Sequence, residues 1–243
     1  ARVVEGHLSR LVLSARALGL PAPVLDDWRL AIEMAAEEWG TEKEGALRLV
    51  LTRGRESGDK PTAFVMVGPV ADRVRQVRES GLSVMTLERG FSVDLSARAP
   101  WQLLGAKTLS YATNMAALRY AANLDADDVI FVSSEGNVLE GPRSTVVIVR
   151  DRTLITPPPA QGILMGTTQR ALFDVAGSAR FDCRYETLRP ADLIAADGVW
   201  MVSSVTLAAR VHTLDGLTLP EPKVSGEFAE LVERAIDSDS AGR

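Results

Sequence analysis

The apolar positions in the N-terminal part of the chain repeat about every 3.6 residues, which predicts two amphipathic helices. Residues 7–18 carry leucine, valine and alanine at helical spacing, and a Gly-Leu-Pro sequence at residues 19–21 ends the pattern. A second periodic stretch extends to Trp39, and Asp26 or Asp27 can cap its first turn. The chain is therefore expected to begin with two helices.

Stretches that alternate between apolar and polar residues follow these helices and predict β-strands. Residues 45–52 and 62–67 flank a turn rich in glycine, aspartate and proline, which is typical of a hairpin. Residues 82–87 form the next strand pattern, and residues 94–100 have the composition of a connector. We place the domain boundary there, with an N-terminal α+β domain at residues 1–97 and a C-terminal domain at residues 98–243.

The C-terminal half alternates short apolar runs with helical patterns. A Ser-Glu-Gly-Asn turn at residues 134–137 separates its first two strands, as in a hairpin. Because short hairpins dominate the pattern, it favours an α+β fold over a doubly wound sheet. The expected strands are residues 127–132, 146–149, 154–155 and 199–202, and the expected helices are residues 114–123, 167–176 and 227–236.

Composition narrows the class of protein. The 243 residues include 46% hydrophobic and 24% charged residues, which suffices for a substantial core. A net charge of −5 with scattered basic residues argues against nucleic acid as a partner, and one cysteine with two histidines argues against a metal site. The sequence contains neither an apolar run of the roughly 18 residues that a membrane span needs nor an export signal. We expect a cytoplasmic protein that binds a small molecule, and an N-terminal segment that precedes Ala1 in the natural protein.

Lys107 is the first candidate for chemistry, because it lies in Gly-Ala-Lys-Thr-Leu-Ser-Tyr, among small and apolar neighbours. Most lysines are solvated, and one at a domain junction can simply cover apolar surface with its stem. A lysine that forms an imine must instead be partly deprotonated, which desolvation promotes. The segment alone leaves both interpretations open.

Further candidates follow at a strand end and at a helix start. Glu140 lies between an apolar pair and a Gly-Pro turn signal, either as an ordinary turn carboxylate or as the partner of a pyridine nitrogen. Thr167 and Thr168 follow a glycine and precede an apolar helix, either as a plain cap or as a phosphate cradle of N–H and hydroxyl groups. An amine, a carboxylate and such a turn are what an enzyme needs to hold pyridoxal phosphate (PLP).

Arg10, Ser203 and Ser204 complete the set of candidate residues. Arg10 is either an exposed helix arginine or a clamp for the phosphate. The two serines follow an apolar strand, either as turn residues or as further hydroxyl donors. They lack a G-x-S-x-G elbow, and no G-x-G-x-x-G turn follows a strand, so a hydrolase and a dinucleotide-binding fold are not favoured.

In order and spacing these segments resemble the class IV, fold-type IV PLP enzymes, which include branched-chain aminotransferases, D-amino-acid aminotransferases and 4-amino-4-deoxychorismate lyases. The resemblance runs from a His-x-x-Arg-Leu helix at residues 7–11 through Lys107 and a Val-Leu-Glu-Gly segment that contains Glu140. It continues through the loop at residues 162–168 to the serines after the last strand.

The resemblance implies specific roles. Lys107 would form the imine with PLP and move protons, and Glu140 would hold the pyridine nitrogen. The phosphate would be bound by Arg10, Thr167, Thr168 and Ser204, with Ser203 beside them. The resemblance also implies a small α/β N-terminal domain, a larger barrel-like C-terminal domain, and a homodimer with the active site at the domain junction.

The sequence departs from the family pattern after Glu140. Where relatives often read Glu-Gly-Ser-Ser-Ser-Asn, this chain has Glu-Gly-Pro-Arg-Ser-Thr, and Gln169 stands where an arginine is frequent. Arg143 is therefore a candidate for recognising a substrate carboxylate, and Tyr111 is a second candidate substrate-binding residue beside Lys107. The family's usual N-terminal strand is absent from the sequence, so its contacts are not assigned.

The segment Lys-Thr-Leu-Ser at residues 107–110 resembles the short lyases more than the branched-chain enzymes. The predicted function is therefore a PLP-dependent 4-amino-4-deoxychorismate lyase of the folate pathway, which gives 4-aminobenzoate and pyruvate. A D-amino-acid or branched-chain aminotransferase of the same fold is the alternative, and a ligand-binding relative without catalysis is a more remote one.

Overall fold

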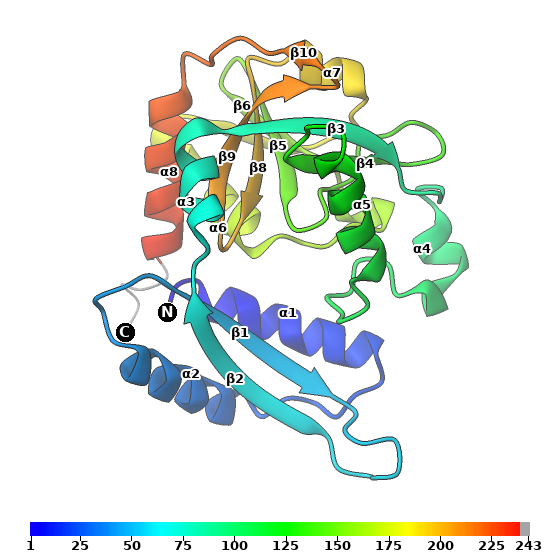
Figure 1. Ribbon diagram of the computed structural model, residues 1–243, viewed down its shortest axis with the longest axis vertical. Helices are drawn as coiled ribbons and strands as arrows, with labels where there is room; N and C mark the ends of the chain where they lie inside the picture. Colours follow the sequence, from blue (N-terminus) through cyan, green and yellow to red (C-terminus); the bar gives the residue numbers. More distant parts are fainter. Residues whose placement is uncertain (239–243) are drawn as a thin grey trace.

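The computed structural model describes residues 1–238 and contains two structural units (Figure 1). In the smaller unit, two helices pack on one antiparallel β-hairpin, as the periodicity predicted. Its core joins Leu8, Trp28 and Ile32 of the helices to apolar residues of the strands. The elements of this unit are α1 (Val4–Ala17), α2 (Leu25–Trp39), β1 (Gly45–Thr52) and β2 (Thr62–Pro69).

The larger unit is built on a mixed, curled sheet with the strand order β4-β3-β9-β8-β5-β6-β7, and β10 pairs with β9. The β3–β4, β3–β9 and β6–β7 pairs are parallel, and the others are antiparallel. The strands are β3 (Leu82–Glu88), β4 (Asp128–Val132), β5 (Thr145–Arg150), β6 (Thr153–Thr156), β7 (Asp182–Tyr185), β8 (Gly198–Ser203), β9 (Leu207–Leu214) and β10 (Leu217–Thr218).

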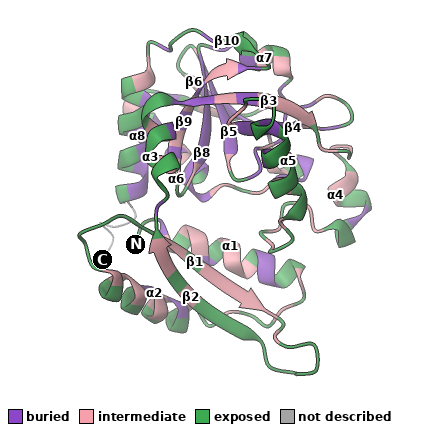
Figure 2. Cartoon of the chain, in the orientation of Figure 1, coloured by how far each residue is buried: buried purple, intermediate pink, exposed green. Residues whose placement is uncertain are grey.

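Helices cover both faces of this sheet. On one side α6 and α8 pack on the sheet, and Trp200 of β8 stacks on Phe228 of α8 with 4.1 Å between ring centroids. Figure 2 shows that the central strands are buried, whereas the smaller unit is largely intermediate or exposed. The helices of this unit are α3 (Asp72–Ser80), α4 (Leu95–Arg98), α5 (Ala112–Ala122), α6 (Thr167–Ala176), α7 (Pro190–Ile194) and α8 (Ser225–Ser238), with single 3₁₀ turns at Pro100–Gln102, Pro159–Gln161 and Gly177–Ala179.

The pairing of the strands corrects one sequence interpretation. β4 and β5 are not neighbours, because β4 pairs with β3 while β5 lies between β6 and β8. The Ser-Glu-Gly-Asn turn instead leads into a single bridge between Val132 and Val138. The turn residues correctly predicted that the chain reverses its direction there. They could not predict which strands pair, because strand pairing depends on segments that are distant in the sequence.

The sequence patterns also missed the helices α3 and α7 and the strands β7, β9 and β10. β3, which precedes the proposed domain boundary, pairs with β4 and β9 of the larger sheet. The division after residue 97 stays a prediction, and this pairing argues for drawing it earlier, between β2 and α3. Among residues 1–238, no helix is both long and apolar enough to cross a membrane.

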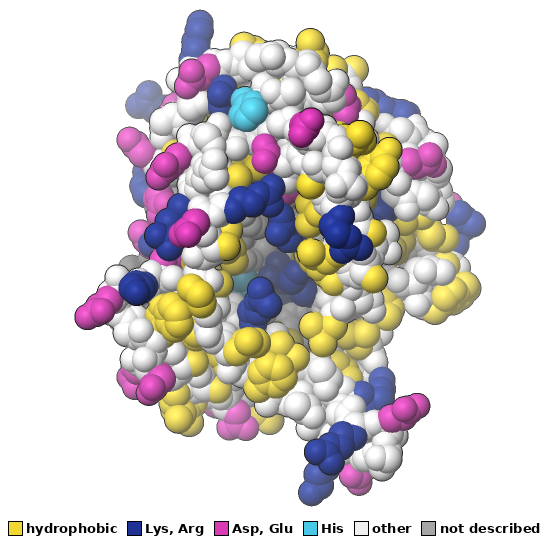
Figure 3. All heavy atoms as spheres, viewed as in Figure 1, with side chains coloured by type: hydrophobic (Ala, Val, Ile, Leu, Met, Phe, Trp, Pro, Cys, Tyr) yellow, Lys and Arg dark blue, Asp and Glu magenta, His cyan; other side chains and the backbone are white. Residues whose placement is uncertain are grey.

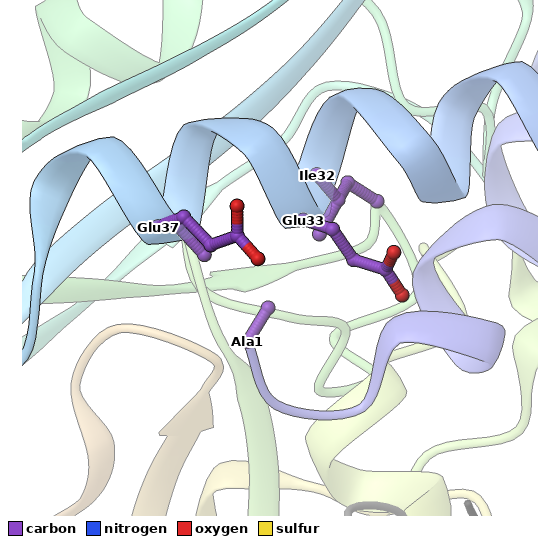
Figure 4. A pocket seen from close by; sticks show the side chains of 5 residues that line it. Ala1, Ile32, Glu33 and Glu37 are labelled. Atoms are coloured by element: carbon purple, nitrogen blue, oxygen red, sulfur yellow. The ribbon is translucent and has the colours of Figure 1, made fainter.

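A hollow of about 390 Å³ lies between Ala1 and one face of α2, with Ile32, Glu33 and Glu37 on its walls (Figure 4). None of the predicted site residues lines it. The candidate chemistry therefore lies in a different cavity.

Candidate active site

A cavity of about 260 Å³ collects side chains from both structural units. Figure 3 shows Lys and Arg side chains gathered in a hollow between the two units. The cavity walls come from α1, the end of β3, the loop before α5, the loop after β4, the start of α6 and the end of β8. The predicted residues on these walls are Arg10, Lys107, Tyr111, Glu140, Arg143, Thr167, Thr168, Ser203 and Ser204, so the structure brings every one of them together.

Lys107 is held by its backbone while its side chain faces the cavity. Its backbone N–H donates to Ser14 Oγ of α1 at 3.0 Å, which ties this loop to the smaller unit. Its Nζ lies 5.6 Å from the ring centroid of Tyr111. Solvent reaches the side chain through the cavity, yet desolvation by the surrounding protein lowers the pKa of Lys107, and the Arg10 charge lowers it further, whereas Glu140 opposes the shift. A lower pKa leaves more of the amine free to act as a nucleophile.

Glu140 also lines the cavity, and its side chain is only partly accessible to solvent. Its Oε2 accepts a hydrogen bond from the backbone N–H of Leu164 at 3.1 Å. Burial raises its pKa to about 7, while that hydrogen bond and the charges of Arg89 and Lys107 act in the opposite direction. The next residue, Gly141, is closely packed, because a Cβ there would lie 2.4 Å from Met201 Cε and 2.5 Å from Ser144 Oγ. The carboxyl group is thus poised between its two protonation states near neutral pH.

Arg10 is oriented by a neighbour on its own helix. Its Nη2 donates to His7 Nδ1 at 3.2 Å, and its Nη1 donates to the carbonyl oxygen of Met165 at 3.4 Å. Burial lowers the pKa of His7 to about 4, and the charges of Arg10 and Lys107 contribute in the same direction. The imidazole is therefore neutral at pH 7 and can accept the hydrogen bond from the guanidinium.

The lowered pKa of His7 predicts a pH-dependent stability. Between about pH 6.5 and about pH 4, His7 is protonated in the unfolded chain but remains neutral in the folded chain. The free energy of unfolding therefore falls as the pH falls through this window. We expect the free energy of unfolding, measured with urea, to fall more between about pH 7 and about pH 5 in the wild type than in His7→Asn. The variant His212→Asn keeps His7 and should keep the wild-type decrease. Equal decreases in the wild type and His7→Asn would contradict the prediction.

The start of α6 presents N–H and hydroxyl groups to the cavity. Gly166 is the N-cap, and a Cβ there would lie 2.3 Å from Thr145 Oγ1. Thr167 and Thr168 are buried in the first turn, and Thr168 Oγ1 has no hydrogen-bond partner in the described structure. A buried hydroxyl without a partner beside free helix N–H groups fits an oxyanion such as a phosphate.

Thr168→Val should separate stability from binding. Removing an unsatisfied buried hydroxyl should leave the free energy of unfolding of the cofactor-free protein unchanged or slightly higher, while PLP binding weakens by about 10-fold. Thr156→Val is the matched control, because Thr156 Oγ1 donates to the Val146 carbonyl at 2.7 Å. That control should lose about 1 kcal/mol of stability. Urea unfolding and PLP titration measure both effects, and unchanged PLP affinity in Thr168→Val would refute this role.

The remaining predicted residues differ in how firmly they are held. Ser203 Oγ accepts the backbone N–H of Thr206 at 3.0 Å, and Ser204 is exposed at the cavity. Tyr111 Oη donates to the carbonyl oxygen of Pro142 at 2.6 Å, and burial raises the pKa of Tyr111. The neighbouring Arg143 lies at the cavity, and its guanidinium stays solvent-accessible.

The polar residues at or beside this cavity that were not predicted include Arg89, Asn114 and Asp128, of which Arg89 and Asn114 line it. Arg89 lies on the wall directly after β3, Asn114 donates to the Pro142 carbonyl at 2.7 Å, and Asp128 lies 3.9 Å from the Arg143 guanidinium. Arg89 could have been chosen as a candidate, because charged residues directly follow the predicted strand at residues 82–87. Asn114 and Asp128 carried no such signal, because their roles depend on the position of the Pro142–Arg143 turn.

Comparison with known proteins assigns the family. The family described as "Amino-transferase class IV" matches residues 2–214, and the chain belongs to this family. It is 55% identical over 248 residues to a bifunctional aminodeoxychorismate lyase / D-amino acid transaminase of Mycobacterium tuberculosis, covering 98% of this chain and 86% of the relative. It is 28% identical over 147 residues to an aminodeoxychorismate lyase of Bacillus subtilis, covering 60% of this chain and 47% of that relative.

Solved structures agree with this assignment. A hypothetical aminotransferase from Mycobacterium tuberculosis in its PLP-bound form is 57% identical with a TM-score of 0.97, covering 98% of this chain and 85% of that one. A fold IV-transaminase from Curtobacterium pusillum is 40% identical with a TM-score of 0.92, covering 99% and 80%. The predicted family and its α+β fold are confirmed, and the predicted cofactor agrees with the PLP-bound relative.

Proposed function

We propose that this chain is a PLP-dependent 4-amino-4-deoxychorismate lyase that releases 4-aminobenzoate and pyruvate. The observation that carries the proposal is a single cavity that joins a lysine amine of lowered pKa, a buried carboxyl group and an anion site at a helix start. These groups match the aldehyde, the pyridine nitrogen and the phosphate of PLP. When bound, PLP supplies a ring that accepts the electrons of a carbanion formed next to the substrate amine.

The chain's own residues supply binding and proton transfer. Arg10, Thr167 and Thr168 hold the phosphate through charge-assisted hydrogen bonds and helix N–H groups. Glu140 binds the ring nitrogen as a carboxylate. Lys107 would anchor the cofactor through its amine and then move a proton at Nζ, and the lowering of its pKa by desolvation favours this role.

A D-amino-acid transaminase is the second candidate. The relative that is 55% identical carries both activities in its name, which favours a site that serves both reactions. The Lys-Thr-Leu-Ser segment at residues 107–110 supports the lyase as the main activity. The homodimer and the cytoplasmic location stay predictions of the family resemblance and the composition.

Two parallel assays test the proposal. The PLP-loaded protein is given aminodeoxychorismate, and 4-aminobenzoate is followed by its fluorescence. The same preparation is given D-alanine with α-ketoglutarate, and D-glutamate is followed. We expect 4-aminobenzoate at the higher kcat/KM, and Lys107→Ala should remove both activities. D-Glutamate without 4-aminobenzoate would replace the lyase with the transaminase, and the absence of both products would favour a ligand-binding relative.

A further inference from the structure

Arg89 is a cationic side chain of the cavity, and it directly follows β3. Its backbone N–H donates to the carbonyl oxygen of Val132 on β4 at 2.8 Å. Its guanidinium lies over the ring of Phe131, with 4.4 Å from the central carbon to the ring centroid. The backbone and the side chain of Arg89 are therefore both fixed against β4.

Phe131 links Arg89 to Glu140. The backbone N–H of Phe131 donates to the carbonyl oxygen of Glu140 at 2.9 Å, and its own carbonyl accepts from Leu139 at 2.8 Å. Phe131 is 4% exposed, so the ring under the guanidinium is itself locked in the core. The residue that holds the Arg89 side chain thus also holds the main chain of Glu140.

The guanidinium of Arg89 lacks part of its hydrogen bonding. Its Nη1 is buried and has no hydrogen-bond partner in the described part of the chain. Burial lowers the pKa of Arg89, and the charge of Glu140 opposes that shift. A buried guanidinium nitrogen without a hydrogen-bond partner costs free energy of folding. We therefore expect the charge of Arg89 to have an electrostatic role toward the carboxylate of Glu140.

We propose that Arg89 is a positioning residue that keeps Glu140 ionised toward the ring nitrogen of the cofactor. The role rests on the proposed function of this cavity. Three ionisable groups interact electrostatically with Glu140. They are Arg89, which directly follows β3, and Lys107 and Tyr111 from the loop before α5. Burial raises the pKa of Glu140 to about 7, while Arg89 and Lys107 lower it. Since Lys107 must lose its proton to act as an amine, Arg89 is the permanent cation among them.

The direct test is the titration of Glu140 in the 243-residue chain without cofactor. The side-chain carboxyl carbon is followed by ¹³C NMR, and its signal is identified by its loss in Glu140→Gln. We expect Arg89→Gln to raise the titration midpoint of Glu140 by about one pH unit. Arg89→Lys keeps the charge and should keep the midpoint near the wild-type value. Arg98→Gln is the matched control, because Arg98 pairs with Asp94 outside the cavity and should change nothing.

The PLP-loaded enzyme provides a second readout. In Arg89→Gln the acid limb of the kcat profile should move to higher pH by the same amount, with KM changed less than kcat. If Arg89→Gln does not fold, Phe131→Leu removes the supporting ring and should raise the midpoint by a smaller amount. An unchanged Glu140 midpoint in folded Arg89→Gln or, where that variant does not fold, in Phe131→Leu overturns the proposal, even where activity falls. A raised midpoint in a protein with neither lyase nor transaminase activity would show that Arg89 keeps Glu140 ionised, while refuting the proposed function.

Discussion

Lys107→Ala is expected to abolish the covalent attachment of PLP and to lower kcat by at least about 10³-fold, because among the described residues Lys107 is the one lysine that lines the cavity. The measurement is borohydride reduction of the PLP-loaded protein, followed by mass spectrometry of the peptide that contains residue 107. In the wild type this peptide should carry the reduced cofactor. In the variant PLP should still bind reversibly, since Arg10 and the start of α6 remain.

Lys60→Ala is the matched control for this experiment. Lys60 is exposed in the loop between β1 and β2 and does not line the cavity. That variant should keep the labelled peptide and the wild-type kcat. Labelling of a different lysine in wild-type protein, or full activity of Lys107→Ala, would show that Lys107 is assigned wrongly.

Glu140→Gln should lower kcat by roughly 10²-fold while PLP still binds, because a neutral amide cannot stabilise a proton on the ring nitrogen. The isosteric change keeps the acceptor oxygen for the Leu164 N–H, so the fold should be retained. Steady-state kinetics over a range of pH check the result. The wild type should lose activity as the pH falls through about 7 and Glu140 takes up a proton, and the variant should lack this limb.

Glu88→Gln controls for the loss of a negative charge in the same region. Glu88 is exposed at the end of β3 and does not line the cavity. It should keep the wild-type kcat and pH profile. If Glu140→Gln matches the wild type, Glu140 does not hold the ring nitrogen.

Local patterns were sufficient for most single elements of the fold. The helix Thr167–Ala176 and the strand Gly45–Thr52 have the predicted bounds, because each has a clear start signal and a regular apolar period. The short β7 and β10 were missed, since a few residues carry too little periodicity. The α3 helix was missed because it buries little more than Val77 and lacks an apolar stripe.

The candidate site was predictable where a residue type is chemically unusual in its local sequence. Lys107 among small apolar residues and Glu140 before a Gly-Pro turn could be identified from their neighbours alone. Arg89 could not be given a role in this way, because its importance depends on Phe131 of the adjacent strand. His7 stood in a recognisable motif, but its hydrogen bond to Arg10 required the geometry of the helix.

The sequence by itself determined which groups are present: an amine, a carboxyl group, and a glycine-threonine helix start, in an order that resembles one enzyme family. Only the tertiary structure decided that they face one cavity, that burial shifts the pKa of Lys107 and Glu140 in opposite directions, and that Arg89 joins them. The physical reason is that periodicity and turn chemistry are local, whereas strand pairing, desolvation and charge coupling depend on residues that are distant in the chain.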